Sequence, residues 1–325
     1  MRSVTMLGPL GLAGLLLAGC ANASPEQAAT GAAGAAVTVD NCGREVTFDT
    51  APERVVTIKS STTEMLLALG VGDRIVATAY PDGPVPEEWA TEAPELPVLA
   101  DRVPSQEVVL EQEPELVYAG WESNFTADGA GERESLEALG VRTYVAPSAC
   151  KGEGYRPNPL TFDDVFAEIR EVASIFRASA AGEGLIAGQE ALLAEVTPLP
   201  EPASALWFSS GTDTPFVGAG IGAPQLILDT VGLTNVAEHI EDSWAPFNWE
   251  AVVDADPDVI VLVDADWNPV EQKIEVLESN PATANLTAVR EKRYLTIDFA
   301  ATEAGVRTAS AVAELADQLA TLGLD

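Results

Sequence analysis

The chain has 325 residues, 47% of them hydrophobic, which is enough for two modest domains with sizeable buried cores. Its 51 Asp and Glu residues outnumber 17 Lys and Arg residues, so the formal net charge is −34 at pH 7. This excess of negative charge excludes nucleic acid, and the anionic surface of a membrane, as partners of the folded body.

The first predicted element, residues 1–20, is an export signal. Arg2 precedes an apolar stretch of roughly ten residues, which is too short to span a bilayer as a permanent helix. The residues that follow, Leu17-Ala18-Gly19-Cys20, resemble a bacterial lipobox. That resemblance implies lipid on the Cys20 thiol and a mature protein tethered outside the cytoplasm, with an ordinary secretory signal as the alternative. Residues 21–36 lack bulky apolar groups and are expected to form a flexible spacer.

Residues 37–158 are predicted to form an N-terminal α/β lobe, because apolar β-branched runs alternate with helical patterns. The expected strands are 55–58, 74–78, 115–119 and 141–145, and the expected helices are 62–69, 105–112 and 132–139. This alternation predicts a parallel sheet covered by helices.

Residues 159–197 interrupt the alternation with a longer helical pattern. Phe166, Ile169, Val172 and Phe176 recur at helical spacing, and few residues before Pro198 would end a helix. The pattern therefore predicts one long, rigid helix that links two lobes.

Residues 198–325 return to the alternation and are predicted to form a C-terminal α/β lobe. The expected strands are 205–208, 259–263 and 294–297, and the main expected helices are 224–231, 249–253, 270–278 and 308–322. The predicted fold class is thus α/β, with two lobes that each contain a mostly parallel sheet flanked by helices.

Ligands of open parallel sheets bind beyond the carboxyl ends of the strands, and this rule selects candidate ligand-binding residues. The candidates are Lys59, Ser60, Tyr80, Trp121, Asn124, Phe125, Lys151, Tyr155, Arg156, Phe208, Trp267 and Arg307. The same strand ends also carry Glu122, Ser209, Asp264, Asp266 and Glu303. The aromatic candidates suit a large planar ligand, and the basic ones would favour an anionic ligand if they converge. Burial of the aromatic residues in the core and scattering of the basic ones are the alternatives.

Few other residues carry chemistry. The single histidine, His239, argues against a histidine-rich metal site and against a Ser-His-Asp hydrolase, so neither a metal nor a cofactor is expected. If Cys20 carries lipid, Cys42 and Cys150 remain as an even pair in an oxidising compartment. We therefore predict a Cys42–Cys150 disulfide, and two free buried thiols are the alternative.

Segments of both lobes carry a resemblance to a known family. They read PERVVTI at 52–58, EMLLALGVGDRIVA at 64–77, SQEVVLEQEPELV at 105–117, VGLTNVA at 231–237, WEAVVDADPDVIVL at 249–262 and LTAVR at 286–290. In their order and spacing they resemble the substrate-binding proteins of ABC importers for ferric siderophores and cobalamin. The resemblance covers nearly all of residues 37–325 and implies a class III periplasmic-binding-protein-like fold.

The same resemblance implies a monomeric solute-binding protein, not an enzyme, whose partners are a small-molecule ligand and an ABC transporter permease. Family members dock arginines of the permease with one glutamate on each lobe, and these positions correspond to Glu107 and Glu250. A simple interaction of each carboxylate with its helix dipole is the alternative. The region in which family members place an aromatic side chain against the ligand contains Trp244 and Phe247.

A narrower resemblance concerns the ligand. The segments KSSTTEML at 59–66, PDGPVP at 81–86 and GWESNF at 120–125, with the Cys42 and Cys150 pair, are similar to actinobacterial proteins proposed to bind a precursor of coenzyme F420. An F420 precursor and a ferric siderophore are the ligands that the sequence favours, and cobalamin is a further candidate. An extracytoplasmic enzyme on the same scaffold and an adhesion or sensor module remain alternative functions.

Overall fold

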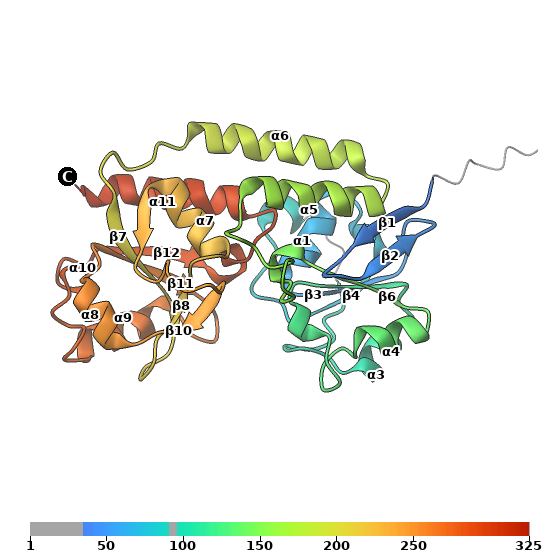
Figure 1. Ribbon diagram of the computed structural model, residues 1–325, viewed down its shortest axis with the longest axis horizontal. Coiled ribbons are helices and arrows are strands. Elements are labelled where there is room, and N and C mark those ends of the chain that lie inside the picture. The colour runs from blue at the N-terminus through green and yellow to red at the C-terminus, as the bar shows by residue number, and fades with distance from the viewer. Residues whose placement is uncertain (1–34, 91–95, 325) are drawn as a thin grey trace, which may run out of the picture. The chain divides into compact units, whose positions relative to one another are not determined.

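The computed structural model describes residues 35–90 and 96–324, and residues 35–325 form one compact unit (Figure 1). Cys20, the predicted export signal and most of the predicted spacer lie outside the described residues. Two sheets dominate the unit, one built from residues 55–145 and one from residues 203–298. We call each sheet with its covering helices the N-terminal and the C-terminal lobe.

The N-terminal lobe is built on a parallel sheet, as the sequence predicts. Its strands are β3 (Val55–Ile58), β4 (Ile75–Ala79), β5 (Leu116–Ala119) and β6 (Arg142–Val145), in the order β4-β3-β5-β6. The helices of this lobe are α1 (Ser60–Ala68), α2 (Glu87–Ala90), α3 (Gln106–Leu110) and α4 (Arg133–Ala138), with 3₁₀ turns η1 (Gly72–Arg74), η2 (Glu122–Asn124) and η3 (Pro147–Ala149). Every residue of β3 and β5 is buried, because helices cover both faces of a parallel sheet.

An antiparallel pair, β1 (Val37–Asp40) and β2 (Glu45–Phe48), precedes this sheet and was not predicted. The turn between its strands is tied to the loop after β6 by a disulfide between Cys42 and Cys150, whose Cα atoms lie 5.4 Å apart. This confirms the predicted pairing of these two cysteines.

The C-terminal lobe contains a mixed sheet. Its strands are β7 (Ala203–Ser210), β8 (Phe216–Gly218), β9 (Leu233–Asn235), β10 (Trp244–Pro246), β11 (Val259–Asp264) and β12 (Tyr294–Asp298). Strands β7, β11 and β12 are parallel neighbours, whereas β8 runs antiparallel to both β7 and β10. The helices are α7 (Ala223–Val231), α8 (Trp249–Ala255), α9 (Val270–Ser279), α10 (Thr287–Arg290) and α11 (Thr308–Leu322), with the 3₁₀ turn η4 (Phe299–Thr302).

The prediction of one continuous linking helix is wrong, because residues 159–197 form two helices. These are α5 (Phe162–Ile175) and α6 (Ser179–Glu195), separated by a turn in which Arg177 adopts a φ of +59°. The turn buries Phe176, and the Arg177 guanidinium donates a hydrogen bond of 2.8 Å to the carbonyl oxygen of Ala35. Neither glycine nor proline marks the break, so the helical spacing alone could not locate it.

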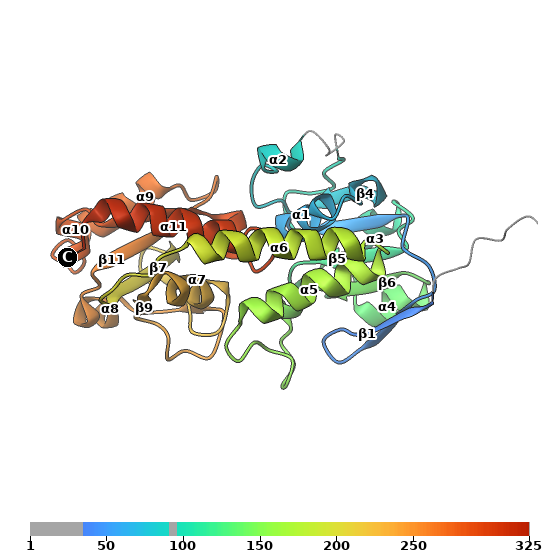
Figure 2. The same ribbon diagram turned by 90° about the horizontal axis from the view of Figure 1, so that it is seen from above.

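Helix α6 spans the two lobes. It packs against α5 at one end and against α11 at the other, as the view in Figure 2 makes plain. Gly182 allows close packing of α6 against α5, since a Cβ there would lie 2.7 Å from Ala173 Cβ. No helix within residues 35–90 and 96–324 is long and apolar enough to cross a bilayer.

The lobes also share apolar contacts. The buried cluster of the N-terminal lobe includes Ala223, Leu226, Ala304 and Val306 of the C-terminal lobe. The amide of Leu160 donates a hydrogen bond of 2.9 Å to the carbonyl oxygen of Ile221, which joins the backbones of the two lobes. The lobes are therefore in direct contact beside α5 and α6, and the candidate site lies where their strand ends face each other.

Candidate ligand-binding pocket

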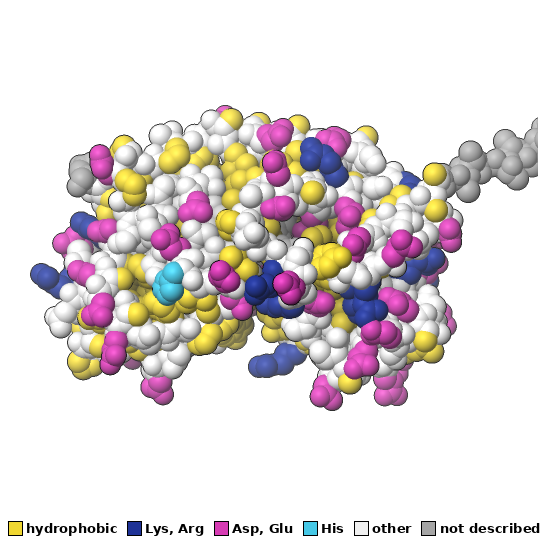
Figure 3. Space-filling model, in the orientation of Figure 1, with side chains coloured by type: hydrophobic (Ala, Val, Ile, Leu, Met, Phe, Trp, Pro, Cys, Tyr) yellow, Lys and Arg dark blue, Asp and Glu magenta, His cyan; other side chains and the backbone are white. Residues whose placement is uncertain are grey.

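An apolar cavity of about 200 Å³ lies between the carboxyl ends of the two sheets. Both lobes contribute to it, because each presents the loops that follow its parallel strands. The cavity is lined by Trp121, Ser123, Ser148, Ala149, Lys151, Ser209, Phe216, Gly222, Ala223, Ser243, Trp244, Phe299, Glu303 and Ala304. The face drawn in Figure 3 is notched between the lobes at its lower edge, and hydrophobic side chains show there.

Aromatic side chains form the wall that the C-terminal lobe contributes. The rings of Phe216 and Trp244 are stacked, with centroids 6.4 Å apart and an interplanar angle of 7°. The ring centroid of Trp244 in turn lies 6.5 Å from that of Phe299, and the Phe299 centroid lies 5.8 Å from that of Trp267, which is 62% exposed. Such a row offers apolar area and ring faces to a planar ligand.

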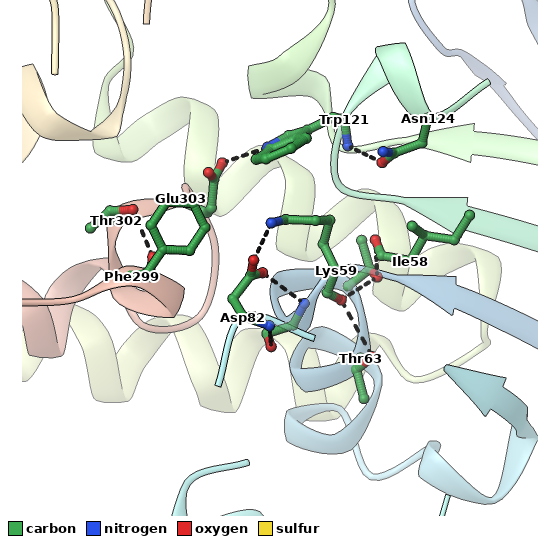
Figure 4. Close-up of polar contacts among 11 residues, drawn as sticks. Ile58, Lys59, Thr63, Asp82, Trp121, Asn124, Phe299, Thr302 and Glu303 are labelled. Atoms are coloured by element: carbon green, nitrogen blue, oxygen red, sulfur yellow. Dashed lines mark hydrogen bonds and ion pairs between the residues drawn. The ribbon is translucent and has the colours of Figure 1, made fainter. Parts of the chain in front are cut away.

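A buried lysine lies beside the cavity in the N-terminal lobe (Figure 4). The Lys59 side chain is 0% exposed and forms an ion pair with Asp82, whose side chain is 2% exposed. The ammonium nitrogen lies 3.8 Å from the ring centroid of Trp121, 4.4 Å from that of Tyr80 and 4.9 Å from that of Phe299. Phe299 belongs to the other lobe, so a cation–π contact crosses between the lobes here.

The backbone at Lys59 is strained, with a φ of +87° that non-glycine residues rarely adopt. Gly120 makes room for this side chain, since a Cβ at Gly120 would lie 2.9 Å from Lys59 Cβ. Ser60 holds the counter-ion, because its amide donates to Asp82 Oδ2 at 3.1 Å and its hydroxyl accepts from the Asp82 amide at 2.9 Å. Burial raises the pKa of Asp82, and Lys59 opposes that rise by charge and hydrogen bonding.

Glu303 lines the cavity and bonds across the lobes. Its Oε2 accepts a hydrogen bond of 3.0 Å from Trp121 Nε1. Its Oε1 is buried and has no hydrogen-bond partner among the described residues. Burial raises the pKa of the Glu303 carboxyl, and the charge of Lys59 offsets only part of that rise.

A second carboxylate at the contact between the lobes is fully paired. Arg307 Nε and Nη2 donate to the two carboxylate oxygens of Glu64 at 2.6 and 2.5 Å, and Nη2 also donates to the Pro84 carbonyl at 3.0 Å. The side chain of Glu64 is 1% exposed and that of Arg307 is 13% exposed. Arg307, a predicted ligand-binding residue, is therefore committed to a bidentate ion pair with the other lobe.

Three of the predicted ligand-binding residues line the cavity together: Trp121, Lys151 and Trp244. Three more of them lie beside Trp121 without lining the cavity: Lys59, Ser60 and Tyr80. Ser60 hydrogen-bonds to Asp82, and the Tyr80 ring packs edge-on against the Trp121 ring with centroids 5.7 Å apart. Lys151 is at the rim, with its ammonium 3.4 Å from a carboxylate oxygen of Asp242. The carboxyl-end rule thus brings together residues that are far apart in the sequence.

Three predicted contacts are wrong, because the side chains point into the lobes. Asn124 caps the turn after β5 by accepting the Trp121 amide at 3.1 Å. Phe125 is 8% exposed within the apolar cluster of the N-terminal lobe. Phe208 is 1% exposed and packs against Trp249 with ring centroids 5.3 Å apart.

Other predicted residues lie near the cavity but do not line it. Tyr155 and Arg156 belong to a neighbouring polar cavity of about 590 Å³, which shares Ser148 and Ala304 with the first. Phe247 packs beside His239, with ring centroids 6.1 Å apart.

The sequence prediction missed several lining residues, chiefly Phe216, Phe299, Ser148 and Ser243. Phe299 directly follows β12, so the carboxyl-end rule would have found it had the strand been extended by one residue. Across the described ranges, no three His, Cys, Asp or Glu side chains gather closely enough to ligate a metal ion.

Glu107 and Glu250 are both exposed and lie in the first turns of α3 and α8. Ser105 and Asn248 cap these helices by accepting the amides of Val108 at 3.4 Å and Ala251 at 2.7 Å. Both helices lie on the side of the sheets away from α6 in Figure 1. This placement suits a pair of docking contacts and also suits a favourable interaction with each helix dipole.

Comparisons with known proteins place the chain among similar molecules. A profile of the family described as "Periplasmic binding protein" matches residues 55–301. The chain is 23% identical, over 95% of its length and 94% of the relative's, to an uncharacterised ABC transporter substrate-binding lipoprotein, YvrC, of Bacillus subtilis.

Solved structures agree with this match. A periplasmic binding protein from Veillonella parvula superimposes with a TM-score of 0.76 at 24% identity, over 87% of this chain and 97% of that chain. An ABC-type Fe³⁺-hydroxamate transport system protein from Saccharomonospora viridis gives a TM-score of 0.74 at 27% identity, over 87% and 98%.

Proposed function

Because this chain belongs to the Periplasmic binding protein family, we propose that it captures a solute between its lobes and delivers it to an ABC importer permease. The observation that carries this proposal is the cavity to which both lobes contribute aromatic walls, Trp121 from one and Phe216, Trp244 and Phe299 from the other. A cavity assembled from two lobes can close on a ligand and release it when the lobes separate. The proposed role is binding without turnover by a monomer.

The proposed location is the extracytoplasmic face of the cell membrane. Lipid on Cys20 would tether the protein, and residues 21–36 would act as the spacer between the lipid and the lobes. The similar protein of Bacillus subtilis is named as a substrate-binding lipoprotein, which supports this placement. The net charge of −34 keeps the folded body from binding anionic lipid, so the lipid is the only expected membrane contact.

The proposed ligand is a large aromatic molecule or a metal chelate. A ferric siderophore is supported by the 27% identical protein whose name refers to Fe³⁺-hydroxamate transport, and an F420 precursor by the aromatic walls of the cavity. Cobalamin is the third candidate. The cavity of about 200 Å³ is smaller than the roughly 300–1,000 Å³ that holds drug-sized ligands.

Such ligands therefore require that the lobes separate or that the ligand extends into the neighbouring cavity. Ser148 and Ala304 line both cavities, so an extended ligand would reach Tyr155 and Arg156. These two residues, with Phe247 and the exposed Trp267, remain proposed contacts for the outer part of a large ligand.

Calorimetric titration tests the ligand assignment. The full-length protein is titrated with a ferric trihydroxamate, cyanocobalamin and the deazaflavin precursor of F420. One of them is expected to bind with 1:1 stoichiometry, and Trp244→Ala and Phe216→Ala should each weaken it by about tenfold, since both remove ring area from the cavity wall. Leu139→Ala is the control, because Leu139 is 59% exposed and does not line the cavity. Absence of binding by all three would overturn the proposed ligand class.

Uptake measurements test the docking assignment. The double variant Glu107→Ala/Glu250→Ala should leave ligand affinity unchanged and abolish uptake through the permease. Each substitution removes a carboxylate that would accept hydrogen bonds from an arginine of the permease. Glu111→Ala/Glu271→Ala is the matched control, since both residues are exposed glutamates on the same two lobes. Full uptake by the first double variant would contradict the docking role.

A further inference from the structure

In the described part of the chain, most of the charged side chains where the lobes meet form ion pairs, but one carboxylate does not. Lys59 is held by Asp82, and Arg307 is held by Glu64, so each of these pairs is neutral. Glu303 has no basic partner within salt-bridge distance among the described residues. Lys151 lies at the rim with a side chain that is 62% exposed, and its ammonium is paired with Asp242. The inner end of the cavity therefore carries one carboxylate in excess.

Among the described residues, a hydrogen bond holds only one of the two oxygens of the Glu303 carboxylate. Trp121 Nε1 donates a hydrogen bond of 3.0 Å to Oε2, as Figure 4 shows. The other oxygen, Oε1, is buried without a partner among the described residues, although Glu303 lines the cavity. A buried acceptor that protein groups leave unpaired is costly, and a ligand donor that reaches it recovers the hydrogen bond.

We propose that Glu303 is a specificity-determining residue, whose Oε1 accepts a hydrogen bond from a solute that presents an N–H group at the edge of a planar ring system. This inference rests on the proposed function, because it assigns a chemical class to the solute of that same cavity. The solute end that reaches Glu303 is neutral or cationic, since a carboxylate or phosphate there would face Glu303 and the nearby Asp82.

The shifted titration of Glu303 agrees with this assignment. Burial raises the pKa of its carboxyl, so the ionised form lacks solvation that a donor would replace. The charged groups that face it are Lys59, Asp82 and Lys151, and the two lysines only partly offset the cost of burial. A ligand with a positive charge would stabilise the ionised form of Glu303.

Benzamidine and benzoate test the proposal, because they are planar rings of nearly equal size with opposite charge. Each is titrated at pH 8 into full-length protein labelled with ¹⁵N, and the indole N–H cross-peak of Trp121, assigned with Trp121→Phe, is followed. Benzamidine is expected to bind at least about tenfold more tightly than benzoate, since it donates charge-assisted hydrogen bonds to the carboxylate. Glu303→Gln should reduce that ratio to about one, because the amide retains an acceptor for Trp121 but loses the charge.

Glu111→Gln serves as the control, since it removes an exposed carboxylate that does not line the cavity, and should leave the ratio unchanged. Equal affinities in the unmodified protein, no saturable shift with either compound up to about 10 mM, or an unchanged ratio in Glu303→Gln would each overturn the proposal.

The two proposals fail in different ways. A benzamidine preference that depends on Glu303, together with no binding of the three candidate ligands, would reject the ligand class and keep the Glu303 site. Tight binding of a candidate ligand to both the unmodified protein and Glu303→Gln, without a benzamidine preference, would keep the function and reject the Glu303 site.

Discussion

Glu64 and Glu303 are two carboxylates at the contact between the lobes, and their surroundings differ. Both oxygens of Glu64 accept hydrogen bonds from Arg307 of the other lobe. Glu303 accepts one hydrogen bond from Trp121 through Oε2, and its Oε1 has no partner among the described residues. A carboxylate with both oxygens paired can hold two lobes together but has no capacity left for a ligand. A carboxylate with one oxygen free can do both.

The largest effect is expected from breaking the fully paired contact. Arg307→Ala leaves Glu64 buried without its cation, and removal of one partner of a buried ion pair costs about 3–5 kcal/mol of unfolding free energy. Urea unfolding followed by circular dichroism measures this loss.

The double variant Glu64→Gln/Arg307→Met is the control, because it removes both charges and retains similar volume. It should recover most of the lost stability. A loss of less than about 0.5 kcal/mol in Arg307→Ala would show that this ion pair does not hold the lobes.

The disulfide restrains the N-terminal lobe at the edge of the cavity, since Cys150 immediately precedes Lys151. Cys42→Ser/Cys150→Ser opens a loop that spans 108 residues and should lower the free energy of unfolding by about 2–4 kcal/mol. Reduction of the unmodified protein should lower the urea midpoint similarly and leave the double variant unchanged. Equal midpoints for both proteins in the absence of reductant would contradict a stabilising disulfide.

A third buried carboxyl extends the comparison to pH. Glu168 on α5 accepts a hydrogen bond of 2.8 Å from the Tyr118 hydroxyl and has no basic partner within salt-bridge distance in the described part of the chain. Burial raises the pKa of its carboxyl to about 7. The Glu168 carboxyl therefore binds its proton more tightly in the folded protein than in the unfolded chain. Protonated Glu168 stabilises the fold at low pH, and this contribution is lost as the pH rises through about 7.

Raising the pH from 5 to 8 ionises Glu168 and should therefore lower the free energy of unfolding by about 2–3 kcal/mol. Urea midpoints at the two pH values check this in the unmodified protein and in Glu168→Gln, which lacks the titrating group. The same pH response in both proteins would show that Glu168 does not titrate in this range.

The smallest effect on stability is expected at Glu303. Glu303→Gln keeps an acceptor for Trp121 and removes a charge that has no salt-bridge partner among the described residues, so the free energy of unfolding should change by less than about 1 kcal/mol. The matched substitution Glu64→Gln should cost more, about 1–3 kcal/mol, because it leaves Arg307 without its charged partner. Urea unfolding measures the loss of unfolding free energy in both variants. Equal losses would contradict the distinction between the fully paired Glu64 and the partly paired Glu303.

The pattern of strands and helices was sufficient to predict two α/β lobes and the position of the cavity at the strand ends. It could not predict which way each side chain points. Trp121 faces the cavity while Phe125, four residues later, packs into the lobe, and both follow the same strand. The rule for parallel strands selects positions, and only the local backbone decides between the cavity and the core.

Phe216 shows a second reason why part of the site could not be predicted. It begins β8, which runs antiparallel to β7, so the start of β8 lies at the edge where β7 ends. A rule based on carboxyl ends of parallel strands passes over such a residue. The break between α5 and α6 was missed for a related reason, since the left-handed turn at Arg177 is stabilised by contacts distant in sequence.

Native mass spectrometry of the protein, purified from the cells in which it naturally occurs, tests most directly whether the cavity between the lobes holds a solute. We expect a 1:1 complex with an aromatic or chelate ligand that persists in Leu139→Ala and is reduced in Trp244→Ala, because loss of the ring weakens binding by about tenfold. A protein that carries no ligand under these conditions, or a ligand that Trp244→Ala retains in full, would contradict this expectation.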